Sequence, residues 1–173
     1  MPHSFHKALF LLFSLGLLSQ AKAENLAELL SGKLVRLEGN QLVDAGPESL
    51  QGKTLIAVYY SASWCPGCRQ FTPMLNRYFN ERKADHPELA IILVSSDRSA
   101  REMSKYMSSH EMPFLALKFP EIKNSFLTKH AAAGIPYLIV LDAEGKVLIE
   151  KEPGENWLNP GIALGRLEYL LKG

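Results

Sequence analysis

The 173-residue chain has two cysteines, Cys65 and Cys68, with two residues between them. An apolar, strand-forming run at 54–60 precedes the pair, and a helical pattern of apolar residues follows at 66–83. The first cysteine is therefore expected at a strand-to-helix junction, where unpaired backbone N–H groups and the helix dipole stabilise a thiolate. The second lies one helical turn further on, on the same side. This spacing supports thiol–disulfide exchange, in which the second thiol attacks a mixed disulfide formed at the first.

A purely structural role for the pair is a weaker interpretation. A disulfide between these cysteines closes a very small loop, so it constrains the unfolded chain little and adds little stability. Zinc needs about four ligands, but there is no second cysteine pair, and His86, His110 and His130 are scattered without ligand spacing. We therefore expect neither a bound metal nor a dissolved cofactor.

Residues 1–23 have the pattern of a secretory signal peptide. The start is weakly basic, the run 8–18 is apolar apart from one serine, and Ala21 and Ala23 occupy the positions that a signal peptidase reads. The apolar run is short for a membrane span, although an uncleaved N-terminal anchor is the alternative. We predict cleavage after Ala23, a single domain over 24–173, and a periplasmic or secreted protein.

Removal of the signal segment would leave a nearly neutral protein. The whole chain has 19 basic and 18 acidic residues and a net charge of +1. The segment contains Lys7 and Lys22 and no acidic residue, so 17 basic and 18 acidic residues remain, with a net charge of −1. This balance argues against nucleic acid as the main partner.

The remaining chain alternates apolar strand patterns with helical patterns. Gly, Pro, Asp and Asn clusters separate the segments. The expected strands are 34–37, 41–43, 54–60, 89–94, 137–141 and 146–150, and 112–117 is an apolar loop or a short strand. The expected helices are 24–30, 66–83, about 99–110, 121–132 and 161–172. This order predicts a three-layer α/β/α domain with a central mixed sheet and an N-terminal hairpin.

Specific motifs resemble those of a known family. The motif Trp64-Cys65-Pro66-Gly67-Cys68, Pro73 within the following helix and the dipeptide Ile135-Pro136 resemble the thioredoxin superfamily. The whole stretch 60–73 and the segments 94–97, 112–117 and 134–139 are similar to the tryparedoxin and nucleoredoxin branch, which is near the exported thioredoxin-like reductases of bacteria. The resemblance covers roughly 34–150 and implies the thioredoxin fold.

The resemblance also implies roles for individual residues. Cys65 would be the nucleophile and Cys68 the resolving thiol. The Ile135–Pro136 peptide bond would be cis and lie beside the cysteines, although trans is the usual state of an X–Pro bond. The backbone of Ile135 would pair with an extended substrate segment. Residues expected to contact substrate are Trp64, Pro66, Gly67, Ile135 and Pro136.

The two tryptophans have different expected roles. Trp64 either shields the disulfide as part of a docking surface or simply packs at the end of the strand. Trp157 is expected to be a hydrophobic lid over the junction with the C-terminal helix.

Two positions depart from the thioredoxin pattern. Many thioredoxins have a buried acid six residues before the first cysteine, but this chain has Tyr59 there, as in the branch it resembles. We expect Tyr59 to be a core residue with a paired hydroxyl, so deprotonation of Cys68 by a carboxylate at this position is in doubt. The dipeptide Pro66-Gly67 contains no histidine, which favours a reductant or a mild exchanger over a strong oxidant.

Together these observations predict an exported thiol–disulfide oxidoreductase that reduces protein disulfides. The expected partners are protein disulfide or dithiol substrates and a membrane thiol reductase as electron donor, with the protein acting as a monomer. We expect no stable membrane insertion after signal cleavage. The alternative is a binding or maturation module for an exported apo-protein, for example in cytochrome c assembly, with redox chemistry secondary.

Overall fold

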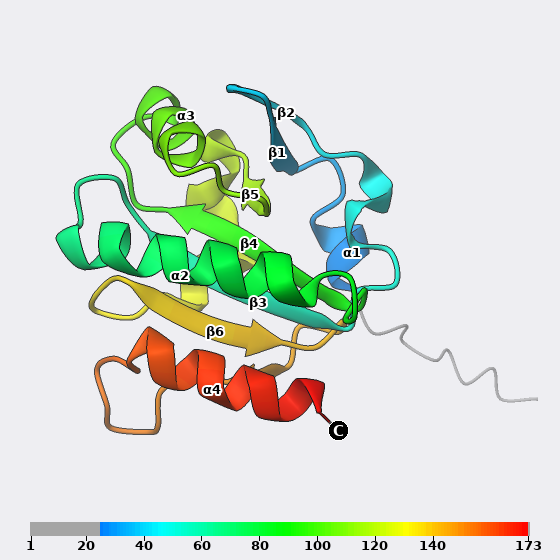
Figure 1. Cartoon of the computed structure of the whole chain (residues 1–173), viewed down its shortest axis with the longest axis vertical. Coiled ribbons are helices and arrows are strands. Elements are labelled where there is room, and N and C mark those ends of the chain that lie inside the picture. The colour runs from blue at the N-terminus through cyan, green and yellow to red at the C-terminus, as the bar shows by residue number, and fades with distance from the viewer. Residues whose placement is uncertain (1–24, 173) are drawn as a thin grey trace, which may run out of the picture.

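A seven-stranded sheet forms the centre of the protein, which we describe over residues 25–172 of a computed structural model (Figure 1). The strand order across the sheet is β2-β1-β5-β4-β3-β6-β7. The strands are β1 (Leu34–Glu38), β2 (Gln41–Asp44), β3 (Leu55–Ser61), β4 (Leu89–Ser95), β5 (Leu115–Leu117), β6 (Tyr137–Leu141) and β7 (Val147–Ile149).

The sheet is mixed, as predicted. Strands β3, β4 and β5 run parallel at its centre, while β6 and β7 extend it antiparallel beyond β3. The predicted N-terminal hairpin is formed by β1 and β2, and β1 joins the sheet through antiparallel pairing with β5. The apolar segment at 112–117 therefore ends in a short strand that connects the hairpin to the parallel centre. Strands β3 and β4 are almost continuously apolar because both faces of the sheet are covered.

Helices cover both faces and complete the three layers. One face carries α2 (Pro66–Arg82), α3 (Ala100–Ser109) and α4 (Pro160–Leu171); the other carries α1 (Leu26–Leu29) and the 3-10 helices η2 (Phe119–Asn124) and η3 (Phe126–His130). Successive side chains of a strand point to opposite faces. Accordingly, the Tyr59 hydroxyl bonds to Thr72 of α2, and the Tyr60 hydroxyl donates to the carbonyl of Leu127 in η3. The predicted thioredoxin-like architecture is confirmed.

The predicted helix over 121–132 is wrong. The structure has η2 and η3 there, interrupted by Ser125, whose backbone is extended (φ −74°, ψ 139°). The hydroxyl of Ser125 accepts a hydrogen bond from the backbone N–H of Leu127. This local bond competes with helix continuation, which is why serine favours caps over helix interiors. A further 3-10 turn, η1 (Pro47–Leu50), lies in the predicted loop after the hairpin.

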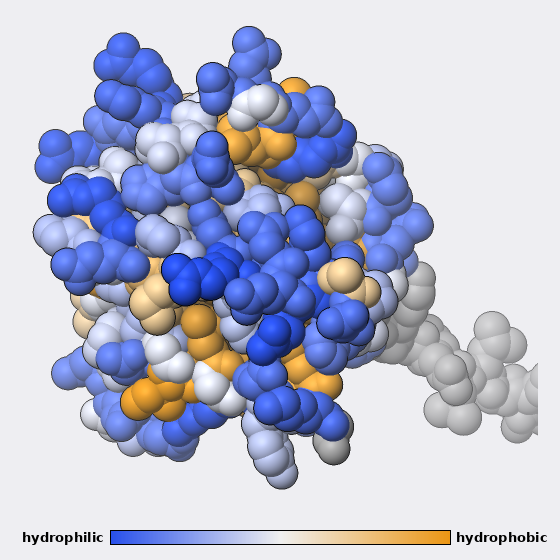
Figure 2. All heavy atoms as spheres, in the orientation of Figure 1, coloured by the Kyte–Doolittle hydropathy of each residue, from blue (hydrophilic) through white to orange (hydrophobic). Residues whose placement is uncertain are grey.

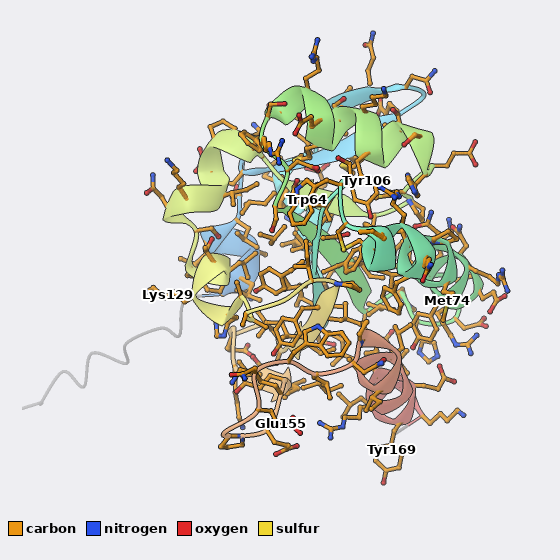
Figure 3. All side chains as sticks on the ribbon, turned by 90° about the vertical axis from the view of Figure 1, so that its left-hand side faces the viewer. Trp64, Met74, Tyr106, Lys129, Glu155 and Tyr169 are labelled. Atoms are coloured by element: carbon orange, nitrogen blue, oxygen red, sulfur yellow. A yellow bond between two sulfur atoms is a disulfide. The ribbon has the colours of Figure 1, made fainter. Side chains whose placement is uncertain are left out.

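The parallel strands end on one edge of the molecule. Figure 3 views this edge, where Trp64 from the loop after β3 lies beside Tyr106 of α3. The face that carries α2 and α4 is mostly hydrophilic, with hydrophobic side chains in small separate groups (Figure 2). The carboxyl edge of the sheet is therefore where the chemistry-bearing loops gather, and the helical faces mainly support it.

The predicted signal segment, residues 1–23, lies outside the described residues. Among residues 25–172, no helix has the length and apolar character to cross a membrane.

Candidate active site

Cys65 and Cys68 form a disulfide at the N-terminus of α2, with their Cα atoms 5.2 Å apart. Cys65 is the N-cap residue, and its Sγ accepts a hydrogen bond of 3.1 Å from the backbone N–H of Cys68. Pro66 follows at the first helical position, where its missing N–H costs nothing because that group has no helical partner. In the reduced protein, the free N–H groups and the helix dipole at this end favour a thiolate on Cys65.

The two sulfurs differ in access. Cys65 is 5 % exposed, whereas Cys68 is fully buried at 0 %. Cys65 is therefore the more accessible of the two to an external disulfide. Its role as nucleophile and that of Cys68 as resolving thiol stay predictions.

The cis-proline loop lies directly against the cysteines. The Ile135–Pro136 bond is cis, as expected from the resemblance, and the carbonyl oxygen of Ile135 lies 3.5 Å from Cys65 Sγ. Gly67 also lies close to this loop, since a Cβ at this position would lie 3.3 Å from Cδ of Pro136. A side chain at Gly67 would push on the proline, which explains why the smallest residue fits there.

A groove of about 560 Å³ runs beside the disulfide, and we call it the cysteine groove. It is lined by Trp64, Cys65, Pro66, Gly67, Ser96, Ala132, Ala133, Gly134 and Ile135. Four of the five predicted substrate-binding residues line it, and the fifth, Pro136, contacts Gly67 at its side. The fold thus brings together segments that are about 70 residues apart in sequence. Their contact with substrate stays a prediction.

Trp64 does not pack inside the strand end. Its side chain is 52 % exposed, and its indole Nε1 donates a hydrogen bond of 3.1 Å to the carbonyl of Ser96. The bond ties the ring to the end of β4 while about half of the side chain stays exposed. Of the two expected roles, this placement favours a docking surface.

Trp157 has a role that the sequence did not reveal. Instead of acting only as a hydrophobic lid, it donates a hydrogen bond of 2.6 Å from its indole Nε1 to the carbonyl of Pro136. The side chain remains 38 % exposed. The loop before α4 therefore supports the cis-proline loop directly.

Asp97 supports the cysteine loop, a role that the sequence analysis did not identify. Its Oδ1 accepts hydrogen bonds from the backbone N–H (2.9 Å) and the hydroxyl (2.6 Å) of Ser63, two residues before Cys65. Its Oδ2 accepts a bond of 2.8 Å from the hydroxyl of Ser95. The N-cap of α3 is Ser99. The available signal was its position two residues after the buried strand β4, which pairs in parallel with β3, the strand that leads to the cysteines.

A network of buried hydroxyl groups lies beneath Cys68. The Thr72 hydroxyl donates to the Cys68 carbonyl (2.9 Å) and can accept from the hydroxyls of Tyr59 (2.9 Å) and Tyr106 (2.7 Å). The hydroxyl of Ser61, hydrogen-bonded to the hydroxyl of Tyr106 at 2.9 Å, completes the network. Burial, followed by the nearby Tyr106, raises the pKa of Tyr59, which stays neutral. The expectation of a core Tyr59 with a paired hydroxyl is confirmed, and a neutral network occupies the place of the buried acid.

The side chains show no arrangement suited to a metal ion within residues 25–172. No group of three or more His, Cys, Asp or Glu side chains gathers there. The polar groups bonded to the cysteines and to Ser63 are a hydroxyl, a backbone carbonyl and the carboxylate of Asp97.

The fold and the paired cysteines define a thiol–disulfide oxidoreductase of the thioredoxin-like class. The family model described as thioredoxin-like matches residues 52–147. Mouse nucleoredoxin is 40 % identical over 123 residues, which cover 70 % of this chain, and tryparedoxin from Trypanosoma brucei brucei is 36 % identical over 126 residues, which cover 72 % of this chain and 83 % of the relative. The chain belongs to the thioredoxin-like family, with nucleoredoxins and tryparedoxins among its relatives.

Solved structures agree with this assignment. The crystal structure of thioredoxin from Wuchereria bancrofti superimposes with a TM-score of 0.62 at 28 % identity, covering 84 % of this chain and 99 % of the other. The nucleoredoxins are much longer, since the matched region spans only 27 % of mouse nucleoredoxin. The similarity to them therefore concerns one redox domain and not their whole length.

Proposed function

We propose that this protein is an exported reductant of protein disulfides, with Cys65 as nucleophile and Cys68 as resolving thiol. The observation that carries the proposal is the position of Cys65: its sulfur caps a helix, is the more exposed of the two, and lies 3.5 Å from the carbonyl of Ile135. One group therefore combines thiolate stabilisation, access and a neighbouring peptide edge for binding a substrate chain.

The chemistry follows from the reduced pair. The Cys65 thiolate attacks one sulfur of a substrate disulfide, so a Cys65–substrate bond forms while the other substrate sulfur leaves as a thiolate. Cys68 then loses its proton and attacks the sulfur of Cys65, which releases the second substrate thiolate. The substrate gains two electrons and two protons, and the protein is left with the Cys65–Cys68 disulfide. A dithiol donor must reduce this disulfide before the next turnover.

The cis-proline loop is the proposed docking edge. A substrate segment in extended conformation would lie along the cysteine groove and pair with the backbone of Ile135, as in other cases where a peptide adds to an exposed backbone edge. Pro136 has no N–H to compete for that pairing. Trp64 would cover the opposite side of the segment, since it lines the same groove.

Three further parts of the proposal rest on the sequence. Residues 1–23 support export, Pro66-Gly67 without histidine supports a reducing role, and a reducing role in an oxidising compartment requires an electron donor, for which we propose a membrane thiol reductase. Expression with a secreting host tests the first: the mature protein should begin at Glu24. Retention of residues 1–23 would contradict signal cleavage.

The decisive experiment uses cysteine variants with a protein disulfide substrate. Cys68→Ser should accumulate a mixed disulfide through Cys65, visible by non-reducing electrophoresis and mass spectrometry, because the resolving step is removed. Cys65→Ser should form no such adduct and lose exchange activity. Full exchange activity in Cys65→Ser would refute the mechanism, and a Cys65→Ala/Cys68→Ala protein that still supported its partner would favour a binding module.

The reduction potential then tests the proposed direction. A value near the ~−270 mV of thioredoxin is expected for a reductant, whereas a value near the ~−120 mV of DsbA would mark an oxidant. Equilibration of the pair with glutathione or dithiothreitol buffers gives this number.

A further inference from the structure

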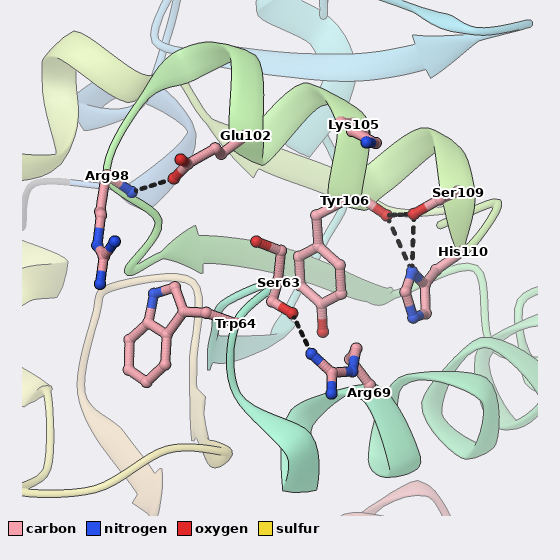
Figure 4. A pocket seen from close by; sticks show the side chains of 9 residues that line it. All are labelled: Ser63, Trp64, Arg69, Arg98, Glu102, Lys105, Tyr106, Ser109 and His110. Carbon is pink, nitrogen blue, oxygen red and sulfur yellow. Dashed lines mark hydrogen bonds between the residues drawn. The ribbon is translucent and has the colours of Figure 1, made fainter.

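A second hollow lies beside Trp64, on the side of α3, and we call it the basic pocket (Figure 4). Its volume is about 340 Å³, and its lining includes Trp64, Arg69, Arg98, Glu102, Lys105 and Tyr106. These residues come from the loop after β3, the first turns of α2 and the segment 98–110. The pocket therefore exists only because α3 packs against the N-terminal end of α2.

The basic pocket carries an excess of positive charge. Arg69, Arg98 and Lys105 line it, against a single carboxylate, that of Glu102. The entire chain has a net charge of only +1, so this excess is local. A concave surface with charges of one sign attracts groups of the opposite sign more strongly than the same charges spread over a flat surface.

The one carboxylate in the lining is already engaged. Glu102 Oε2 accepts a hydrogen bond of 2.9 Å from the backbone N–H of Arg98, and the Glu102 N–H donates to the Ser99 hydroxyl. Both bonds lie at the start of α3, where Ser99 is the N-cap residue. Figure 4 shows that the guanidinium of Arg98 points away from Glu102 and toward the indole of Trp64. Asp97, the nearest other acid in sequence, is buried and bonded to Ser63 and Ser95.

The cations themselves are not neutralised. Within residues 25–172, neither Arg98 nor Lys105 forms an ion pair, and the guanidinium of Arg69 bonds to a neutral group, the carbonyl of Ser63 (2.9 Å). That bond fixes Arg69 beside the cysteine loop, while its charge stays available. Arginine and lysine together suit carboxylates of a bound chain.

The basic pocket adjoins the cysteine groove, with Trp64 between them. Trp64 lines both hollows, and it is the residue immediately before Cys65. A substrate chain that presents a sulfur to Cys65 can therefore cross the indole and enter the pocket. The side chains that would enter it are those that closely flank the substrate cysteine.

The geometry points to a specificity site for acidic residues that flank the reacting cysteine of the substrate. This inference rests on the proposed function, because it names the class of protein disulfide that the same site would reduce. Arg98 and Lys105 are the specificity-determining residues, and neither is a catalytic residue. Electrostatic complementarity of this kind acts mainly on association, so its effect should appear in the second-order rate constant and depend on salt.

The test compares three symmetrical peptide disulfides that differ only in flanking residues: Glu, Gln or Lys on both sides of the cysteine. Each is mixed with the pre-reduced full protein, and free peptide is measured after acid quench and chromatography. At low ionic strength the Glu disulfide should react about tenfold faster than the Gln disulfide, and the Lys disulfide more slowly. The difference between Glu and Gln should shrink to about threefold or less at 0.5 M NaCl.

Charge reversal gives the matched comparison. Arg98→Glu/Lys105→Glu should invert the order, so that the Lys disulfide becomes the fastest. Arg77→Glu, an exposed α2 residue about three turns beyond the cysteines, should keep the order of the unmodified protein. Circular dichroism checks that each variant folds. If the double variant does not fold, Arg98→Gln replaces it, and Arg98→Gln should reduce the preference for the Glu disulfide over the Gln disulfide.

The outcomes separate the two proposals. Three results would overturn the basic pocket as a specificity site while exchange itself is retained. They are equal rates for the three disulfides, a preference for the Glu disulfide that survives charge reversal, and a loss of that preference in Arg77→Glu as large as in the charge-reversal variant. Failure of the unmodified protein to reduce any of the three would instead overturn the proposed function, and the inference with it.

Discussion

The indole of Trp157 and the carbonyl of Pro136 are joined by a hydrogen bond of 2.6 Å, which links the loop before α4 to the cis-proline loop. The carbonyl of the preceding residue, Ile135, faces Cys65 Sγ. Trp157 is therefore a positioning residue for the edge along which a substrate would bind, although it lies 21 residues further along the chain.

Trp157→Phe should weaken substrate reduction more than folding. The variant keeps an aromatic ring but loses the N–H, and one hydrogen bond contributes about 1 kcal/mol, equivalent to a severalfold change in rate. We expect a higher KM for a protein disulfide with a reduction potential close to that of the unmodified protein. Tyr169→Phe is the control, because Tyr169 is 80 % exposed on α4. Unchanged kinetics in Trp157→Phe would remove the positioning role.

Asp97→Ala should destabilise the protein by about 2 kcal/mol. The substitution removes the hydrogen-bond acceptor for Ser63 and Ser95. A buried polar group left without a hydrogen-bond partner costs about 1–3 kcal/mol of stability. The cysteine loop should also become more mobile, with faster amide exchange at Ser63. Urea denaturation measures the first effect and hydrogen exchange the second. Asp85→Ala, at an exposed position, should leave both near their original values.

The hydroxyl network predicts an order of stability between two variants. Tyr59→Phe should cost about 1 kcal/mol, since Thr72 keeps its bonds to Tyr106 and the Cys68 carbonyl. Thr72→Val should cost more, because it leaves the buried Tyr59 hydroxyl and the Cys68 carbonyl without their 2.9 Å partner. Thermal or urea unfolding decides this, and the reverse order would show that Thr72 is not the centre of the network.

The same network gives an alkaline pH dependence. The folded state raises the pKa of Tyr59, mainly through burial and then through Tyr106. The neutral hydroxyl therefore contributes stability that is fully present below the unfolded pKa of ~10 and is lost as the pH rises beyond it. Tyr59→Phe should lose less stability than the unmodified protein between neutral pH and about pH 11. Parallel plots of unfolding free energy against pH for the two proteins would show that Tyr59 does not contribute to this loss.

An ion pair between α2 and α4 predicts the opposite dependence. Arg82 Nε lies 3.0 Å from Glu168 Oε2, and this hydrogen bond lowers the pKa of Glu168. Because the pKa of Glu168 is lower in the folded state, the ion pair contributes stability at a pH above the ordinary carboxyl pKa. This contribution is lost as the pH falls through the folded-state pKa. Urea midpoints of Glu168→Gln and the unmodified protein should differ at pH 7 and converge in acid. The effect should be small because both side chains remain partly exposed to solvent.

Local sequence features predicted most of the architecture. The apolar runs that became β3 and β4, and the proline after Cys65, specify strand and helix through contacts within a few residues. The same holds for the paired cysteines, because a C-x-x-C at a helix start needs no distant partner to be recognised. The wrong helix prediction over 121–132 also had a local cause. The Ser125 hydroxyl bonds to the backbone N–H of Leu127, and this bond separates one 3-10 helix from the next.

The sequence by itself therefore determined the redox pair, the strand-to-helix junction that activates it and the class of fold. Only the tertiary structure decided what surrounds the sulfurs. Asp97 meets Ser63 across 34 residues because β3 and β4 pair in parallel and end at the same edge. The basic pocket likewise requires α3 to pack beside the start of α2. Such contacts depend on strand register and helix packing, which no short stretch of sequence encodes.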